Sequence, residues 1–323
     1  MAEASLTAVL TAPGTIVLEE RAVPEPAADE VLVEVRSVGV CGSDTHYFEH
    51  GRIGRFAVEQ PLVLGHESSG VVVAVGSGVD PERVGQRVSL EPGVPCRACE
   101  QCAAGRYNLC PRIVFHATPP VDGSLTRLLA HHHSFAHPVP DHVSDDAAAL
   151  VEPLSVGLWA CRRGGVRTGS RVLVTGAGPV GLLALQAARV AGATDVVLAP
   201  GRTLAERYAG RGGPEVLLEC SGHPGATVDA LGLLAPAGTA VLVGMGSDEL
   251  PLPVPLVQER ELWVTGVFRY AHTWPTAIAL VASGAVRVDE LVTGHFPLAE
   301  TARALTAARD DARALKSVIR VQE

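Results

Sequence analysis

Four closely spaced cysteines place the strongest constraint on this chain. Cys96, Cys99, Cys102 and Cys110 lie in the stretch PCRACEQCAAGRYNLC. Zinc binds four thiolates in a tetrahedron, and spacers this short let a single loop surround the ion. Such a filled site has no position for a substrate, so the pattern predicts a structural zinc. Two disulfides are the alternative, which the large chain and the lack of a signal-peptide pattern at its start disfavour.

Size and charge limit the classes of protein that fit. The 323 residues exceed what one hydrophobic core usually serves, which predicts two domains. The net charge is −9, and acidic and basic residues are interleaved, which disfavours a nucleic-acid partner. No apolar run approaches the roughly 20 residues of a membrane span. We therefore expect a soluble, cytoplasmic protein with neither nucleic acid nor membrane as a partner.

The hydrophobic pattern changes along the chain. Segments such as 31–35 and 70–75 alternate with period two and predict a β-rich, barrel-like first part. From about Asp145, helical stretches over 145–165 give way to apolar strands that alternate with helices, which indicates a doubly wound parallel sheet. The expected strands are 171–175, 195–199, 216–220, 239–243 and 262–267. The expected domains are 1–148, catalytic and zinc-binding, and 149–267, nucleotide-binding, with 268–323 returning to the first.

A glycine-rich turn follows the first strand of that sheet. The strand 171–175 leads into Gly176-Ala-Gly-Pro-Val-Gly181 and then a helix over 182–190. In this order of elements, Gly176 permits a tight turn, Gly178 lets the backbone approach a pyrophosphate, and Gly181 lets helix and strand pack closely. The phosphates meet the unpaired amides of the helix N-terminus. The turn, including Pro179 and Val180, is therefore predicted to bind a dinucleotide.

A second set of metal ligands precedes the cysteine loop. Cys41 comes directly after a strand, and His66-Glu67 follows about 25 residues later. One thiolate, one imidazole and one carboxylate leave the fourth zinc position open for water or an alcohol oxygen, as in catalytic sites. Taken singly, an isolated cysteine is most often buried and packs like a small apolar residue, and an isolated His-Glu pair most often lies at the surface in contact with water. Together with the cysteine loop and the glycine turn, they predict a catalytic zinc.

Several stretches across nearly the whole chain resemble zinc-dependent medium-chain alcohol dehydrogenases, and within them the sorbitol (L-iditol) and xylitol dehydrogenases. These stretches are CGSDTHYFEHGRIG at 41–54, PLVLGHESSG at 61–70, GRYNLC at 105–110, ATPPVDGSL at 117–125, ALVEPLSVGLWACRRGGV at 149–166, GAGPVG at 176–181 and GVFRYAHTWP at 266–275. The resemblance implies an α/β protein with a β-rich GroES-like catalytic domain and a Rossmann-type nucleotide domain. It implies oxidation of a polyol hydroxyl to a ketose, with hydride transfer to NAD.

The resemblance also implies roles for individual residues. Cys41, His66 and Glu67 form the catalytic zinc shell, with Glu67 bound directly or through water and Glu152 as an alternative ligand or water partner. Ser43, the cofactor ribose and His46 form a proton relay. The residues expected around the polyol are Tyr47, Phe115, Thr118, Glu152, Arg269 and Tyr270, and those expected near the nicotinamide are Gly244, Met245, Gly246, Phe268 and Arg269. A homo-oligomer, tetramer or dimer, is implied, and the strand with Trp263 is a candidate edge for dimer pairing.

The chain departs from this pattern at the second strand of the sheet. An acidic residue that binds the ribose hydroxyls of NAD is expected after 195–199, but Pro200, Gly201 and Arg202 stand there. Only 202–213 separates this strand from the next, enough for one helix. We therefore expect five strands instead of six, a nucleotide domain shortened by about one β-α unit. Arg202 gives the hypothesis that NADP replaces NAD, because a guanidinium pairs with a 2′-phosphate.

Two alternatives to polyol oxidation stay open. One is a dehydrogenase of another alcohol such as threonine, and the other is a zinc-stabilised scaffold or binding protein with an impaired cofactor site. Two zincs per chain favour an enzyme, whereas one zinc, in the cysteine loop, favours the scaffold.

Other polar residues have ordinary explanations. His131–His133 and His137 lie on a predicted strand whose side chains alternate between faces, so we expect them to be solvated. Cys161 and Cys220 are expected in the core, and Asp44 and Glu49 at surface or turn positions.

Overall fold

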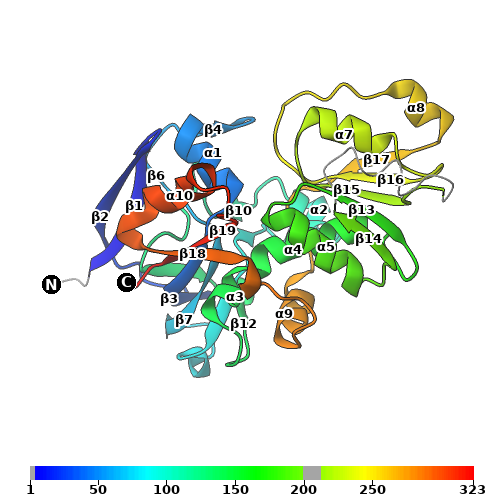
Figure 1. The fold of residues 1–323 in the computed structure, drawn as a ribbon. Coiled ribbons are helices and arrows are strands. Elements are labelled where there is room, and N and C mark those ends of the chain that lie inside the picture. The colour runs from blue at the N-terminus through cyan, green and yellow to red at the C-terminus, as the bar shows by residue number, and fades with distance from the viewer. Residues whose placement is uncertain (1–3, 199–211) are drawn as a thin grey trace. The chain divides into compact units, whose positions relative to one another are not determined.

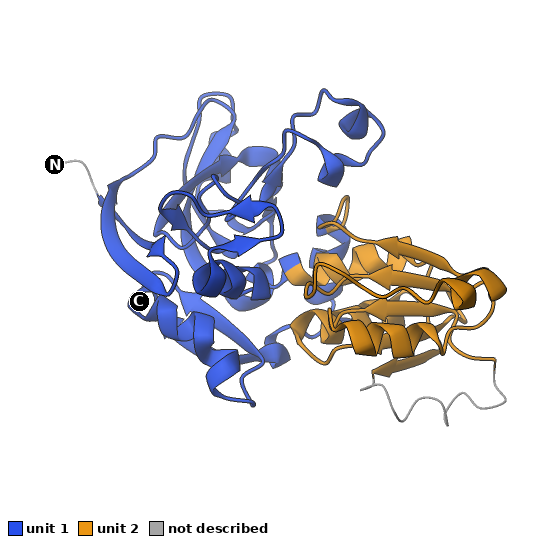
Figure 2. Ribbon diagram, turned by 90° about the horizontal axis from the view of Figure 1, so that it is seen from above, with its two compact units in different colours: residues 1–152, 274–323 blue, residues 153–273 orange. Residues whose placement is uncertain are grey.

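The computed structural model describes residues 4–198 and 212–323, which form two compact units (Figure 2). Unit 1 comprises residues 1–152 and 274–323, and unit 2 comprises residues 153–273. The boundaries expected from the sequence, after residues 148 and 267, lie a few residues earlier.

Unit 1 is built on a seven-stranded sheet. Its order is β12 (Ala136–Pro138), β8 (Arg87–Leu90), β7 (Glu67–Val75), β3 (Glu30–Gly39), β19 (Lys316–Arg320) and β18 (Val292–Pro297), and β11 (Leu128–His132) also pairs with β3. The alternating segments 31–35 and 70–75 are confirmed as strands, since they lie in β3 and β7, which pair antiparallel. The C-terminal segment enters this sheet through β19, which also pairs with β3.

Smaller strands and helices complete unit 1 (Figure 1). A second sheet has the order β2 (Thr15–Ala22), β1 (Ala4–Ala12) and β6 (Leu62–Val63), and the short pairs are β4 (Arg52–Ile53) with β5 (Phe56–Ala57) and β9 (Gly93–Val94) with β10 (Val114–Phe115). The helices are α1 (Gly42–His50), α2 (Glu100–Ala103), α3 (Asp145–Ala149), α9 (Trp274–Ala282) and α10 (Thr301–Asp310), and α4 (Val151–Arg163) runs on into unit 2. Short 3-10 turns are η1 (Pro81–Arg83), η2 (Tyr107–Leu109), η3 (His133–Phe135), η4 (Asp289–Leu291) and η5 (Leu298–Glu300).

Unit 2 contains the expected parallel sheet. The strand order is β14 (Asp195–Leu198), β13 (Arg171–Thr175), β15 (Val216–Glu219), β16 (Thr239–Leu242) and β17 (Trp263–Gly266), and all pairs are parallel. The helices described in this unit besides α4 are α5 (Pro179–Val190), α7 (Pro224–Leu231) and α8 (Val254–Glu259). All five strands expected from the sequence are confirmed. Pro200, Gly201 and Arg202, and most of the expected helix over 202–213, lie outside the described residues.

Burial on both faces explains why apolar and polar residues do not alternate along these strands. Leu173, Leu217 and Ala240 lie in register on three neighbouring strands and pack in one cluster with Leu231 of α7. The neighbours of Leu173 on β13, Val172 and Val174, are also fully buried. A strand covered on both faces needs apolar residues at every position. None of the helices in residues 4–198 and 212–323 is both long and apolar enough to cross a bilayer, and the cytoplasmic location stays a prediction.

The expectation of solvated histidines is wrong for His131 and His132. Only 3% of His131 and 6% of His132 is exposed. His131 Nε2 lies 3.0 Å from the carbonyl oxygen of Glu91, and its ring centroid is 4.8 Å from that of His116. Burial lowers the pKa of His131 to about 4. The alternation rule predicts one solvent-facing side, but both faces are covered here, since His131 packs against His116 and His132 against Phe135.

His137 is half-buried, and its Nε2 lies 2.9 Å from the carboxylate of Glu91. The same carboxylate accepts a hydrogen bond from the Tyr107 hydroxyl at 2.6 Å. Because Tyr107 lies between two cysteines of the metal loop, this contact fastens that loop to the sheet. His131 and His132 on β11 and His137 on β12 therefore belong to the packing of unit 1.

Candidate metal centres and cofactor turn

The three expected catalytic ligands come together in unit 1. The ligand atoms of Cys41, His66 and Glu67 all lie within 4.8 Å of one another. Cys41 is the N-cap of α1, two residues after β3 ends at Gly39, and Glu67 begins β7. Gly39 and Glu67 are paired across the sheet. The register of β3 on β7 therefore brings together ligands that are distant in sequence.

Asp44 is a correction to the sequence-based expectation of a surface or turn role. It is only 1% exposed. Its carboxylate accepts hydrogen bonds from the amides of Cys41 at 3.1 Å and Gly65 at 3.0 Å, and it lies 3.5 Å from His66 Nδ1. A carboxylate on one ring nitrogen fixes the orientation of a histidine and leaves the other nitrogen for a metal. The signal in the sequence is the capping-box spacing between Cys41 and Asp44.

The electrostatics of this site favour a cation beside His66. Burial lowers the pKa of His66, but the negative charges of Asp44 and Cys41 outweigh it and raise that pKa well above its ordinary value. For Asp44, burial raises the pKa, and the opposite charge on His66 outweighs this and lowers it. A buried imidazole between a thiolate and a carboxylate is a donor set that fits zinc, whose binding displaces the proton.

Lys316 completes the surroundings of Glu67, and sequence reasoning missed it. It is the only lysine in the chain and is 3% exposed. Its Nζ lies 2.7 Å from Glu67 Oε1 and 2.5 Å from Oε2, and it donates to the carbonyl oxygen of Val40 at 2.8 Å. Burial opposes the charge on Lys316, but Glu67 and Cys41 outweigh it and raise the pKa of Lys316. The missed signal is the single lysine of the sequence at the start of Lys316–Arg320, a strand whose first four residues are buried.

Gly39 passes close to the same carboxylate. A Cβ atom at this position would lie 2.2 Å from Glu67 Oε2. A side chain at position 39 would therefore displace the Glu67 carboxylate from its contact with Lys316, and glycine leaves that carboxylate in place.

Two further residues expected near the catalytic zinc, Phe115 and Glu152, are buried in unit 1. Phe115 is buried, with its ring centroid 6.0 Å from that of His66. Glu152 is 5% exposed and lies near enough to Lys316 for its charge to contribute to the raised pKa. Among the described residues, Glu152 is not within the compact set of ligand atoms.

The remaining expected residues of unit 1 lie on α1 and in the loop after β10. Ser43 and His46 are half-buried on α1, and the His46 ring is 5.7 Å from that of the exposed His50. Tyr47 is 4% exposed and belongs to the hydrophobic cluster beneath α1. The half-buried Thr118 donates its amide to the carbonyl oxygen of Phe115 at 3.2 Å. Glu49, expected at the surface, pairs with Arg309 at 2.8 Å.

In unit 2 the glycine turn has the expected backbone. Gly176 has a φ of +83°, Gly178 is the N-cap of α5, and Pro179 begins that helix, followed by Val180. A Cβ at Gly181 would lie 1.8 Å from the carbonyl oxygen of Gly176, so helix and turn are in direct backbone contact. Amides at the start of α5 are thus available to a phosphate.

The expected nicotinamide residues follow β16 and β17. The segment Gly244, Met245 and Gly246 begins two residues after β16 ends at Leu242, and Met245 is 54% exposed. After β17, the Arg269 guanidinium lies 4.7 Å from the ring centroid of Phe268, and Tyr270 is buried. Both segments lie at the carboxyl ends of parallel strands, where such sheets bind ligands. Cys161 is buried as expected, whereas Cys220 is only partly buried.

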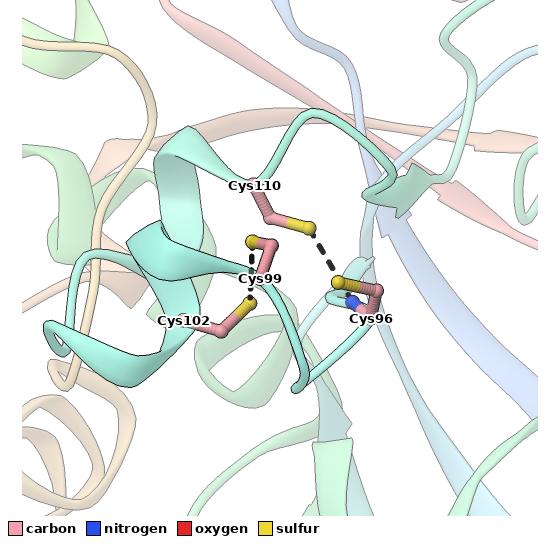
Figure 3. Close-up of side chains that lie close together, drawn as sticks. All are labelled: Cys96, Cys99, Cys102 and Cys110. Atoms are coloured by element: carbon pink, nitrogen blue, oxygen red, sulfur yellow. Dashed lines mark hydrogen bonds between the residues drawn. The ribbon is translucent and has the colours of Figure 1, made fainter.

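The cysteine loop gathers its four sulfurs in one small volume (Figure 3). All lie within 4.8 Å of one another, and all are free thiols, so the two-disulfide alternative is not supported. The amide of Ala98 and the guanidinium of Arg112 lower the pKa of Cys96 to about 6. Desolvation and the neighbouring Cys99 raise the pKa of Cys102 to about 12. A further thiolate is therefore costly until a cation neutralises the cluster, which fits a zinc held by four sulfurs.

Replacing Cys99 by Ser tests whether the two metal sites are separate. We expect the variant to lose the zinc of the cysteine loop, to keep zinc at Cys41, and to melt at least about 5 °C lower, because structural zinc contributes directly to folding. Elemental analysis and thermal unfolding measure this, with Cys161→Ala as a control that retains both metals. Loss of both zincs from a folded Cys99→Ser protein would contradict the assignment.

Replacing Lys316 by Met tests its role beside Glu67. Without metal, the variant leaves a buried carboxylate unpaired, and we expect the free energy of unfolding to fall by about 3–5 kcal/mol. Zinc should restore much more stability to Lys316→Met than to the unchanged protein, because the ion supplies the missing positive charge. Denaturant unfolding with and without zinc measures both effects. The control Arg309→Met removes an exposed cation and should cost less than about 1 kcal/mol, with or without zinc. Equal zinc effects in both variants would contradict this role.

Comparisons with known proteins agree with this geometry. Residues 27–141 match the alcohol dehydrogenase GroES-like domain, and residues 202–283 match the zinc-binding dehydrogenase family. The chain is 44% identical to sorbitol dehydrogenase of Bos taurus over 331 residues, which cover 94% of this chain and 93% of the bovine protein. It is 44% identical to sorbitol dehydrogenase of Homo sapiens over 320 residues, 91% of this chain and 90% of the human one.

Solved structures extend the similarity over nearly the full length. An Escherichia coli oxidoreductase/dehydrogenase of unknown specificity superposes with a TM-score of 0.94 at 32% identity, over 99% of this chain and 100% of that one. L-idonate 5-dehydrogenase from Escherichia coli superposes with a TM-score of 0.92 at 28% identity, over 99% of each chain. With these similarities, a compact Cys-His-Glu centre, a four-cysteine loop and a glycine-rich turn, the chain belongs to the zinc-dependent medium-chain dehydrogenases, in their polyol dehydrogenase branch.

Proposed function

We propose that this chain oxidises a secondary hydroxyl of a polyol of the sorbitol, xylitol or L-iditol class to a ketose and passes the hydride to NAD. The observation that carries the proposal is the set of the half-buried Cys41 and the buried His66 and Glu67, whose three unlike ligand atoms lie within 4.8 Å of one another. Three protein ligands leave a coordination position for a substrate oxygen. The similarity to sorbitol dehydrogenases supports a polyol over another alcohol such as threonine.

The proposed metal content is two zincs per chain, one catalytic and one structural. Zinc at Cys41, His66 and Glu67 would supply a Lewis acid toward the alcohol oxygen. Asp44 keeps the His66 ring oriented, and Lys316 holds the Glu67 carboxylate with both oxygens in contact. Because Lys316 neutralises Glu67, the carboxylate donates less charge to a bound cation than a free one would, which favours an electrophilic centre.

The alcohol proton needs a route to solvent. Ser43 and His46 stand on α1, the helix that Cys41 caps, and both are half-buried. His46 lies beside the exposed His50. We therefore assign the relay to the Ser43 hydroxyl and the His46 imidazole, with Glu152 as a further polar group at the metal.

The proposed substrate residues supply one apolar wall and several hydrogen-bonding groups. Phe115 packs beside His66, and Thr118 follows it in a tight turn. Tyr47, Glu152, Arg269 and Tyr270 complete the set. A site of hydroxyls, a carboxylate and a guanidinium suits a chain of hydroxyl groups, because each can form directed hydrogen bonds with it.

For the cofactor, we propose that residues 176–181 bind the pyrophosphate and that Gly244, Met245, Gly246, Phe268 and Arg269 surround the nicotinamide. NADP is the second candidate, because the sequence places Arg202 where an acidic ribose ligand is expected.

We also propose pairing of two copies along β17. This strand is the edge of the five-stranded sheet, and its Trp263 is 73% exposed. An uncovered edge strand with a large apolar side chain suits a second copy, giving a dimer or a tetramer built from dimers.

Replacing His66 by Ala tests the metal role. Turnover of sorbitol should fall by at least about 1,000-fold, because an incomplete ligand set no longer holds the Lewis acid. The dissociation constant for NADH, measured by fluorescence titration, should stay within about twofold, since the glycine turn is unaffected. His142→Ala removes an exposed histidine and serves as the control. Turnover near the unchanged level in His66→Ala would reject the proposed centre.

Titration of NAD and NADP against the zinc-loaded protein tests the cofactor assignment. We expect kcat/KM to be at least about tenfold higher with NAD. Arg202→Ala should lower the use of NADP and leave that of NAD unchanged, because only NADP carries a 2′-phosphate. Failure of both nucleotides at millimolar concentration would refute the enzyme and favour the scaffold alternative.

A further inference from the structure

Glu219 is a buried carboxylate at the carboxyl end of β15, where three loops of unit 2 meet. It is 2% exposed. Its Oε1 accepts hydrogen bonds from the Thr175 hydroxyl at 3.1 Å, from the Ser221 amide at 2.9 Å and from the Ser221 hydroxyl. The Gly222 amide donates to both oxygens at 3.2 Å. The side chain thus links the residue before the glycine turn to the loop after β15.

The main chain of the same residue reaches a third loop. The carbonyl oxygen of Glu219 accepts hydrogen bonds from the amides of Val243 and Gly244, each at 2.8 Å. Gly244 begins the segment assigned to the nicotinamide. One residue therefore has hydrogen bonds to the starts of all three loops, those after β13, β15 and β16.

The loops also touch through backbone alone. A Cβ at Gly176 would lie 2.8 Å from the Ser221 amide nitrogen, and one at Gly244 would lie 2.3 Å from that of Gly222. A Cβ at Gly246 would lie 2.0 Å from the carbonyl oxygen of Gly222. With no side chains between them, a shift of the loop after β15 is transmitted to the other two.

The cost of leaving buried hydrogen-bond donors unpaired makes Glu219 the residue that fixes the three loops relative to one another. A buried carboxylate is tolerated only when hydrogen-bond donors surround it, and losing the acceptor leaves the same donors unsatisfied. Thr175 is also buried, so its hydroxyl has little access to water as a substitute partner. The three loops therefore keep the arrangement in which their donors reach Glu219.

We propose that Glu219 is a positioning residue for the nicotinamide cofactor, which holds the pyrophosphate turn and the nicotinamide segment in register through the loop after β15. This inference rests on the proposed function. Glu219 acts through the segments that it holds, because its hydrogen bonds go to the three loops.

Glu219→Gln tests the inference, because it keeps the shape but replaces one acceptor oxygen by a donor. The dissociation constant for NADH should rise at least about tenfold, as expected for lost hydrogen bonds to a charged group. The KM for NAD should rise in parallel while kcat at saturating NAD stays within about threefold. A role confined to stability would lower the melting temperature without this split. Zinc content should stay unchanged.

Amide hydrogen exchange gives a readout that needs no cofactor. In Glu219→Gln, exchange should become faster at 176–181, 220–222 and 243–246 together. The matched control is Glu215→Gln at the opposite end of β15, where Glu215 pairs with Arg171 at 3.5 Å and is 48% exposed. NADH affinity and exchange in the three loops should not change in that control.

The outcomes separate the inference from the proposed function. If the unchanged protein binds NADH and Glu219→Gln binds it equally well, with unaltered exchange, the inference is overturned and the proposed function stands. If the unchanged protein binds neither NADH nor NADPH, the proposed function fails, and exchange alone decides whether Glu219 fixes the loops. If Glu219→Gln does not fold, Ser221→Ala and Thr175→Val each remove one donor and should weaken NADH binding about threefold. Unchanged affinity in both folded variants would overturn the inference.

Discussion

The pairing of β3 with β7 is the interaction on which the metal centre depends. It places Gly39 opposite Glu67, so that the residue capping α1 and the residues beginning β7 meet at one point. Glu67 lies on the sheet itself, and Cys41 and His66 lie within two residues of its strands β3 and β7. A slip of one residue in this pairing would turn Glu67 to the other face of the sheet. The precision of the centre is therefore a property of backbone hydrogen bonding.

Charge balance is the second requirement of that centre. Cys41, Asp44 and Glu67 bring negative charge into a buried region, and His66 and Lys316 bring the positive charge that opposes it. A cation is favoured where acidic groups exceed basic ones and water is excluded. The single lysine of the chain, Lys316, suits this position for a physical reason. Its compact ammonium group approaches both oxygens of Glu67 and the carbonyl oxygen of Val40, whereas the larger guanidinium group of an arginine would need more room.

The two units present different chemical groups to the ligands expected there. Unit 1 concentrates ionisable side chains, because a metal needs charged or strongly donating ligands. At the carboxyl edge of the sheet in unit 2, glycines replace side chains so that backbone amides can approach a dinucleotide. Glu219 resembles Asp44 in one respect. Each is a buried carboxylate that accepts backbone amides and thereby fixes the groups expected to contact a ligand.

The sequence by itself determined what is local in the chain. The spacing of Cys96 to Cys110, the glycine turn before α5 and the five apolar strands of unit 2 are all readable, because each depends on residues a few positions apart. Cys41, His66 and Glu67 were predicted as a set from their residue types beside the cysteine loop and the glycine turn, and the family resemblance then gave them the roles of a catalytic zinc shell. Tertiary structure alone decided the environments of Asp44, His131 and Lys316. Lys316 meets a partner 249 positions away, and burial of this kind is fixed by sheet register and packing, which no local pattern records.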